Sequence, residues 1–190
     1  MSRGGAISIA VLLTLFSCAC SRQREPLGEF NTVPDFQLVD QTGAPFSSAG
    51  QLRGKVWVAD FIFTNCQGPC PRMGSQMRQV QAALTDVQAV RLVSFTVDPK
   101  RDTPEVLAAY ARRFQAQPGR WFFLTGDVET LHRLSLKAFM LSGLNDQMDH
   151  STRFVLVDAQ GRVRKYYDTT EPQSIPDLIA DARALARVAP

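Results

Sequence analysis

Two cysteines, Cys66 and Cys70, stand four positions apart in the stretch 64-TNCQGPCPRM-73. Thiols at this spacing are able to form a redox pair, a metal site or a structural disulfide. A disulfide between them would close a very short loop, and the stabilisation that a disulfide gives grows with the length of its loop. A purely structural bridge is therefore the weakest of the three interpretations, and redox or metal chemistry is favoured.

The residues around the two thiols predict that both lie at the start of a helix. Cys66 follows an apolar run, and Cys70 precedes Pro71, which a first helical turn tolerates because its missing N–H would be unpaired there. The helix dipole and the free backbone N–H groups at such a terminus favour a thiolate over a thiol, so we expect a lowered thiol pKa. Gly68 and Pro69 let the chain turn so that the two sulfurs face each other.

The extra residue between the cysteines favours a metal site over a simple exchange site. Thiol exchangers of the thioredoxin type use C-x-x-C, and the wider turn here leaves more room for an ion between the sulfurs. Two thiolates suit Cu(I) or Zn, and an imidazole would complete a three-ligand site. Of the two histidines, His132 lies in a predicted helix, where a solvent-facing or partly buried position is expected. His150 precedes a predicted strand, beside the cysteine loop in a thioredoxin-like fold, and is either a ligand or an ordinary loop histidine.

Strands alternate with helices along most of the chain, which is typical of an α/β protein. A short hairpin is expected over 34–46, and a buried strand over 56–63 ends just before the cysteines. Further strands are expected over 90–98, 121–125, 153–158 and 162–168, and helices over 71–84, 104–114, 128–141 and 175–188. This order resembles the thioredoxin superfamily, with a central mixed β-sheet flanked by helices and an N-terminal β-hairpin.

The N-terminus predicts an export signal over 1–17, in which a positive charge precedes an apolar run over 6–16. The run is shorter than the roughly 20 apolar residues that span a membrane. Its end at Cys18 (or Cys20) resembles a bacterial lipoprotein signal, in which cleavage leaves that cysteine as the lipid-bearing first residue, although Phe16 is bulky for its place. Plain secretion and an uncleaved N-terminal anchor are the alternatives, and all three place the protein outside the cytoplasm.

The rest of the chain suits one domain behind an appendage. Residues 18–32 carry Pro26, Gly28 and several charges without an apolar period, which predicts a flexible tether and a folded domain over 33–190. The chain has 21 Lys and Arg against 18 Asp and Glu, and the basic residues are scattered. A nucleic-acid partner is therefore disfavoured.

Three separated stretches carry motifs that agree with one family: 61-FIFTNCQGPCPRM-73, 94-SFTVDPKRDTPEVLAAYARRF-114 and 149-DHSTRFVLVDAQGRV-163. The combination of F-x-x-T-x-C-x-x-x-C-P, V-D-P-x-x-D-T-P and D-H-S/T is specific, whereas C-x-x-x-C alone would be weak. The chain resembles the SCO/SenC family of copper proteins, which help to assemble the copper centre of cytochrome c oxidase. The resemblance implies that Cys66, Cys70 and His150 bind copper, as Cu(I) and Cu(II), and that the oxidised pair forms a Cys66–Cys70 disulfide.

The same motifs suggest roles for neighbouring residues. Asp149 would orient His150 or act as a weak outer ligand, but a solvated loop carboxylate is the simpler interpretation. Asp98 lies at the carboxyl end of its strand, where it would tune the thiols or contact a partner, or else cap the following turn. The rest of that motif is expected to organise the loop and the start of the next helix: Arg101, Asp102 and Thr103.

One departure from the family pattern affects the cysteine loop. Most members carry Pro, often Pro-Asp, directly after the first cysteine, and this chain has Gln67 and Gly68. Losing a local carboxylate makes the site less negative and the loop more flexible, which puts copper affinity and redox potential in question. Met73 and Met77 are soft side chains, but they lie on the apolar stripe of the predicted helix and are expected in the core.

The resemblance implies a metallochaperone whose cargo is a copper ion. Its partner would be the copper-bearing subunit of cytochrome c oxidase, besides other copper chaperones or thiol reductases, at the periplasmic face of the bacterial inner membrane. The alternatives are a thiol–disulfide oxidoreductase that reduces the cysteines of the oxidase copper site, and a redox or copper sensor. A peroxidase is disfavoured, because Thr64 stands too close to Cys66 and no proline lies near Asp60.

Overall fold

The structure, a computed structural model, describes residues 26–141 and 151–189. Within these ranges, seven strands form one sheet in the order β2-β1-β5-β4-β3-β6-β7. The strands are β1 (Gln37–Asp40), β2 (Pro45–Ser47), β3 (Val56–Ile62), β4 (Val90–Thr96), β5 (Trp121–Thr125), β6 (Arg153–Val157) and β7 (Val163–Asp168). The helices are α1 (Ser48–Gln51), α2 (Pro69–Ala83), α3 (Pro104–Arg113), α4 (Val128–Arg133) and α5 (Ser174–Arg187), and a π-helical turn, η1 (Leu134–Ala138), follows α4.

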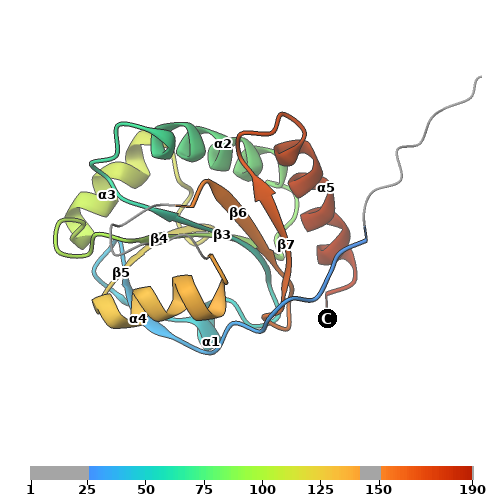
Figure 1. The fold of residues 1–190 in the computed structure, drawn as a ribbon, viewed down its shortest axis with the longest axis horizontal. Helices are drawn as coiled ribbons and strands as arrows, with labels where there is room; N and C mark the ends of the chain where they lie inside the picture. Colours follow the sequence, from blue (N-terminus) through green and yellow to red (C-terminus); the bar gives the residue numbers. More distant parts are fainter. Residues whose placement is uncertain (1–25, 142–150, 190) are drawn as a thin grey trace, which may run out of the picture.

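The sheet is mixed, with a parallel centre. Strands β3, β4 and β5 run parallel, whereas β6 and β7 on one side and β1 and β2 on the other pair antiparallel. Helices α2, α3 and α5 cover one face, and α1, α4 and η1 cover the other (Figure 1). This layered arrangement and the hairpin of β1 and β2 confirm the thioredoxin-like α/β fold that the sequence predicts.

Two cores form because successive side chains of a strand point to opposite faces of the sheet. All seven residues of β3 are buried, as expected of a central strand covered on both sides. On the α2 side, Met73 and Met77 are fully buried, which confirms that they are core residues. On the α4 side, Trp57 and Phe61 of β3 pack against Phe139, with ring centroids 5.7 and 5.3 Å away.

The helix expected over 128–141 differs from the prediction in its second half. It starts as predicted, because the Asp127 carboxylate accepts a hydrogen bond from the backbone N–H of Thr130 at 2.8 Å. After Arg133 the chain widens into η1, where the backbone N–H of Phe139 donates to the carbonyl five residues earlier. Periodicity alone did not show this change, which accompanies the burial of Phe139 in the aromatic core.

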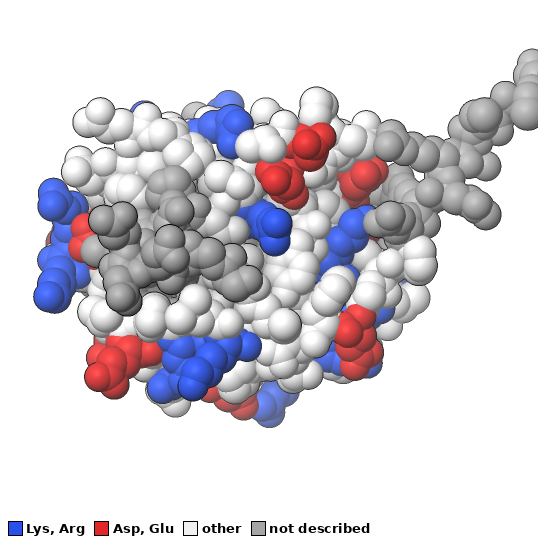
Figure 2. Space-filling model, viewed as in Figure 1, with Lys and Arg blue, Asp and Glu red and all other residues white. Residues whose placement is uncertain are grey.

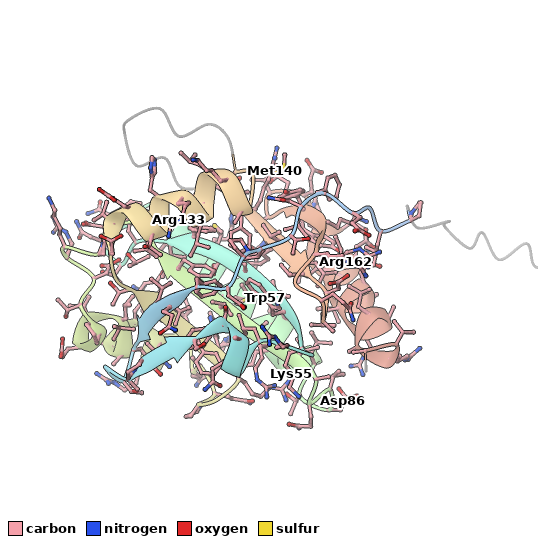
Figure 3. The ribbon with its side chains drawn as sticks, turned by 90° about the horizontal axis from the view of Figure 1, so that it is seen from below. Lys55, Trp57, Asp86, Arg133, Met140 and Arg162 are labelled. Atoms are coloured by element: carbon pink, nitrogen blue, oxygen red, sulfur yellow. The ribbon has the colours of Figure 1, made fainter. Side chains whose placement is uncertain are left out.

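The N-terminal segment pairs with the start of β7. The backbone N–H of Phe30 donates to the Val163 carbonyl at 3.0 Å, and the N–H of Val163 donates to the Asn31 carbonyl at 2.7 Å. Glu29 forms an ion pair with Arg162, which lies beside this segment in Figure 3. The contacts of the folded domain therefore begin within the stretch expected to be a tether, and they lie at the end of the sheet opposite to the carboxyl end of β3 (Figure 1).

Charges of both signs are interspersed on the face of the molecule in Figure 2. In the part of the chain that the structure describes, no helix is long and apolar enough to cross a membrane. The expected export signal over 1–17 and the candidate lipidation sites Cys18 and Cys20 lie outside the described residues.

A close contact between α2 and the end of α3 gives a test of the packing around the cysteine helix. A Cβ atom at Gly74 would lie 2.5 Å from Cζ of Phe114. We expect Gly74→Ala to lower the free energy of unfolding by about 1 to 3 kcal/mol, because the aromatic ring would have to move. Gly50→Ala is the control, since its Cβ would meet only the Ser47 Cβ at 3.9 Å. Chemical denaturation measures both, and equal losses would contradict the close packing.

Candidate functional site

The two cysteines lie together at the carboxyl end of β3. Cys66 stands in the loop that follows the strand, and Cys70 is the second residue of α2, after Gly68 at the N-cap and Pro69 at the first position. Both are free thiols and both are buried, with 8% of Cys66 and 0% of Cys70 exposed. Cys66 lies close enough to Cys70 to help raise the pKa of its thiol. The predicted place at a helix start is confirmed, and the sulfurs are within reach of each other.

Burial outweighs the helix terminus in setting the acidity of Cys70. The pKa of this thiol is raised from 9.0 to about 12, mainly by loss of solvation. Among the smaller causes, the backbone N–H of Phe63 donates to the sulfur and lowers the pKa, whereas Cys66 and the buried Asp60 help to raise it. The expected lowering is therefore wrong for Cys70, because a sulfur inside the core loses more solvation than the helix terminus returns. At neutral pH the Cys70 thiol keeps its proton.

A buried carboxylate ties the cysteine loop to the end of β4. Asp102, which is 0% exposed, accepts hydrogen bonds from the backbone N–H of Thr64 at 3.1 Å and from its hydroxyl at 2.5 Å. It also accepts from the Thr96 hydroxyl at 2.6 Å, and Thr96 in turn accepts from the backbone N–H of Asp98 at 2.9 Å. Asp102 thus organises its loop as expected, and it also contacts a residue two positions before Cys66.

The remaining residues of the V-D-P-x-x-D-T-P motif serve the turn before α3. The Asp98 carboxylate pairs with Arg101, with Nε and Oδ2 3.2 Å apart, and the Asp98 carbonyl accepts the backbone N–H groups of Arg101 and Asp102. These bonds support the turn-capping interpretation of Asp98. Thr103 occupies the N-cap of α3, but its hydroxyl donates to Glu105 and makes no cap bond to the backbone.

A second buried carboxyl group faces the same core as the cysteines. Asp60 is 1% exposed, and neither of its oxygens has a well-formed hydrogen bond to any described residue. Loss of solvation raises its pKa from 3.8 to about 7, and the nearby Ser94 hydroxyl lowers it only in part. The hydroxyl of Tyr110 is likewise buried without a hydrogen bond to a described residue. The polar groups of Asp60 and Tyr110 are therefore buried in this core without well-formed hydrogen bonds to described residues.

The predicted third ligand, His150, and its neighbour Asp149 lie outside the described residues. The strand that follows them, β6, begins near the cysteine loop. β6 pairs antiparallel with β3, Ala59 opposite Val155, so Arg153 starts β6 at the edge where the cysteine loop leaves β3. Among the described residues, no group of three or more His, Cys, Asp and Glu side chains is placed to hold a metal ion.

The structure does not bring the other histidine to the cysteines. His132 is exposed on α4, and α4 covers the face of the sheet opposite to α2, so its expected solvent-facing position is confirmed. The residues that replace the family's Pro-Asp, Gln67 and Gly68, are exposed, as is Asn65. The accessible part of the cysteine loop therefore carries no charged side chain.

A comparison with family models matches residues 24–187 to the model described as SCO1/SenC. The chain belongs to the SCO1/SenC family. It is 37% identical over 183 residues to the SCO1 protein homolog of Bacillus subtilis, with 92% of this chain and 93% of that protein covered. The family that the sequence motifs indicate is thereby confirmed.

Solved structures of SCO1/SenC proteins share the fold over most of the chain. A SCO1/SenC family lipoprotein from Bacillus anthracis is 38% identical, with a TM-score of 0.74, and covers 86% of this chain and 98% of its own. BsSco, a member of the Sco family of cytochrome c oxidase assembly proteins in which a disulfide switch was identified, is 34% identical, with a TM-score of 0.74 and coverage of 87% and 98%. ScoI from Bradyrhizobium japonicum, solved with copper bound, shares the fold at 24% identity and a TM-score of 0.66, with 81% and 99% covered.

The sequence patterns did not predict two features of this SCO1/SenC site. A single carboxyl residue inside the apolar run 56–63 signals that Asp60 is buried on the central strand, but not that it faces the cysteines. The bond from Thr64 to Asp102 joins residues 38 positions apart, and no local pattern indicates it. Both features depend on the pairing of β3 with β4.

The buried Asp60 predicts an unusual dependence of stability on pH. Because its pKa is 3.8 when unfolded and about 7 when folded, the unfolded carboxyl loses its proton first, and stability falls as the pH rises through this window. We expect the free energy of unfolding to fall by about 2 to 3 kcal/mol between pH 5 and pH 8 on account of this group. Chemical denaturation across this pH range measures the fall.

Asp60→Asn is the informative variant, because its amide does not titrate in this range. Its free energy of unfolding should lack the component that falls between pH 5 and pH 8. Asp86→Asn is the matched control, since Asp86 is an exposed surface partner of Arg183. If the Asp60→Asn protein kept the full slope of the wild type, the raised pKa of Asp60 would be wrong.

Proposed function

We propose that this chain is a copper metallochaperone that binds Cu(I) and Cu(II) through Cys66, Cys70 and His150. Its task is the assembly of the dinuclear copper centre of cytochrome c oxidase. The observation that carries the proposal is the pair of free, neighbouring thiols at the start of α2 in a chain of the SCO1/SenC family. The oxidase-assembly role of BsSco and the copper-bound structure of ScoI are consistent with it.

The chemistry of the donors fits a soft ion that must be released again. Two thiolates and a neutral imidazole are soft or intermediate ligands, and a three-coordinate site leaves the ion open to an incoming ligand from a partner. Cys66 is the more exposed thiol, so it meets the ion or the partner first, and the buried Cys70 closes the site from inside. Since Cys70 is protonated at neutral pH, it gives up a proton when it becomes a ligand.

Titration of the reduced protein with Cu(I) against a competing chelator tests the ligand set. We expect one ion per chain, and Cys66→Ala, Cys70→Ala and His150→Ala should each weaken binding by at least about a hundredfold, because each removes one of three ligands. His132→Ala, a change of the same kind on the opposite face, should bind as the wild type does. Tight binding that is indifferent to His150 would refute the three-ligand site.

The same titration repeated at several pH values tests the state of Cys70. Its proton must leave when copper binds, so the apparent affinity should rise with pH by at least about tenfold per unit between pH 6 and pH 8. The sign follows from the raised pKa, since the free thiol stays protonated across this range. An affinity that is flat over these two units would show that Cys70 is already a thiolate in the metal-free protein.

A second function, thiol–disulfide exchange, is favoured by the closeness of the two free thiols. In this reaction the two thiols of the reduced pair pass two electrons and two protons to a target disulfide. The Cys66–Cys70 disulfide forms and the target is left as two thiols, so atoms and electrons balance. The disulfide switch of the relative BsSco supports this chemistry in the family.

His150→Ala distinguishes the two functions, because copper delivery needs a third ligand and exchange does not. We expect this variant to lose copper transfer to an oxidase copper-site fragment and to reduce the disulfide of that fragment at the wild-type rate, within about twofold. Transfer is followed by the absorption of the copper centre, and exchange by thiol labelling. Equal loss of both activities would refute the separation.

We also propose that the protein acts at the periplasmic face of the bacterial inner membrane, held by a lipid on Cys18 or Cys20. The leader pattern and the lipoprotein of Bacillus anthracis in the same family support this placement. The copper-bearing subunit of cytochrome c oxidase would then be a partner in the same membrane.

A further inference from the structure

The two sulfurs of the pair are held by different supports. Cys70 belongs to α2, whose side chains Met73 and Met77 are fully buried, so the helix fixes this sulfur. Cys66 lies in a loop, where its own backbone N–H makes a bond of 3.3 Å to the Phe63 carbonyl. The position of Cys66 relative to Cys70 therefore depends on how the chain is held as it leaves β3.

Thr64 is the point at which the chain is held. Its backbone N–H and its hydroxyl both donate to Asp102, so one carboxylate fixes both the main chain and the side chain of this residue. Asp102 is itself fixed from two other directions. The Thr96 hydroxyl donates to it at 2.6 Å, and its backbone N–H donates to the Asp98 carbonyl at 2.9 Å.

We infer that Asp102 is a positioning residue for the thiol pair: by holding Thr64, it keeps Cys66 opposite Cys70. It sets how readily the pair closes to a disulfide and how tightly the pair holds a metal ion. The metal part of this inference rests on the proposed function, and the disulfide part does not.

A carboxylate is required at this place because three donors from two strand ends converge on two oxygens. An asparagine has one acceptor oxygen and turns an N–H₂ group toward the remaining donors, which leaves a buried donor without a partner. In Asp102→Asn the Thr64 contact should loosen, so Cys66 samples positions away from Cys70. The local concentration of one sulfur at the other then falls.

The test compares Asp102→Asn with Asp181→Asn in the otherwise intact chain. Asp181 is also a buried carboxylate, on α5, and it accepts the Tyr167 hydroxyl at 2.8 Å, so the control makes the same chemical change away from the cysteine loop. The first readout is the equilibrium between the dithiol and the disulfide of the metal-free protein in glutathione buffers. The second is Cu(I) affinity against a chelator, and chemical denaturation measures the stability of each variant.

We expect Asp102→Asn to lower the equilibrium constant for the disulfide and the Cu(I) affinity by about tenfold each. Asp181→Asn should lower stability but leave both quantities within about twofold of the wild type. A purely structural role for Asp102 predicts a loss of stability alone, and that outcome would overturn the inference. Equal shifts in both variants would overturn it too.

If Asp102→Asn does not fold, Thr64→Val tests whether Asp102 positions the thiol pair. It removes only the hydroxyl bond and keeps the backbone N–H bond to Asp102, so we expect a smaller fall in the disulfide equilibrium constant, of about threefold. An unchanged constant in this variant would count against Asp102 as a positioning residue. If the wild type binds no Cu(I), the copper proposal fails on its own, and the disulfide readout still tests Asp102.

Discussion

The parallel pairing of β3 with β4 is the constraint on which the site depends. Its register runs from Val56 opposite Val90 to Ile62 opposite Thr96, so both strands end at the same edge of the sheet. The ladder continues one step further, where the backbone N–H of Val97 donates to the Ile62 carbonyl at 2.8 Å. Only this alignment lets a motif more than thirty residues away in the sequence reach the loop that carries Cys66.

Two buried carboxyl groups near these strand ends differ in the hydrogen bonds that they receive. Asp102 and Asp60 are both withdrawn from water, at 0% and 1% exposure. Asp102 receives N–H and O–H donors that replace the lost water. The oxygens of Asp60 have no such donor among the described residues, and loss of solvation raises the pKa of Asp60 to about 7. Asp102 binds the cysteine loop through Thr64, whereas Asp60 lowers stability at neutral pH without a compensating bond to any described residue.

The sequence predicted the elements whose pattern is local and missed what depends on packing between them. The buried run of β3, the helix with Met73 and Met77 on its stripe, and the hairpin near the N-terminus were all predicted correctly. The acidity of Cys70 was not, because the helix dipole is visible in a sequence and the depth of a sulfur in the core is not. The Thr64 contact also needed the sheet register, and His150 stays a prediction.

The place where the N-terminal segment joins the domain decides how far the cysteines lie from that segment. It enters at the amino end of β3, and the cysteines stand at the other end, about 20 Å away along a seven-residue strand. If the proposed lipid on Cys18 or Cys20 is present, at most about 30 Å of extended chain would separate it from Leu27. A domain standing upright on that anchor would then point its cysteines away from the bilayer. It would reach an acceptor site above the membrane surface more directly than one at the level of the headgroups.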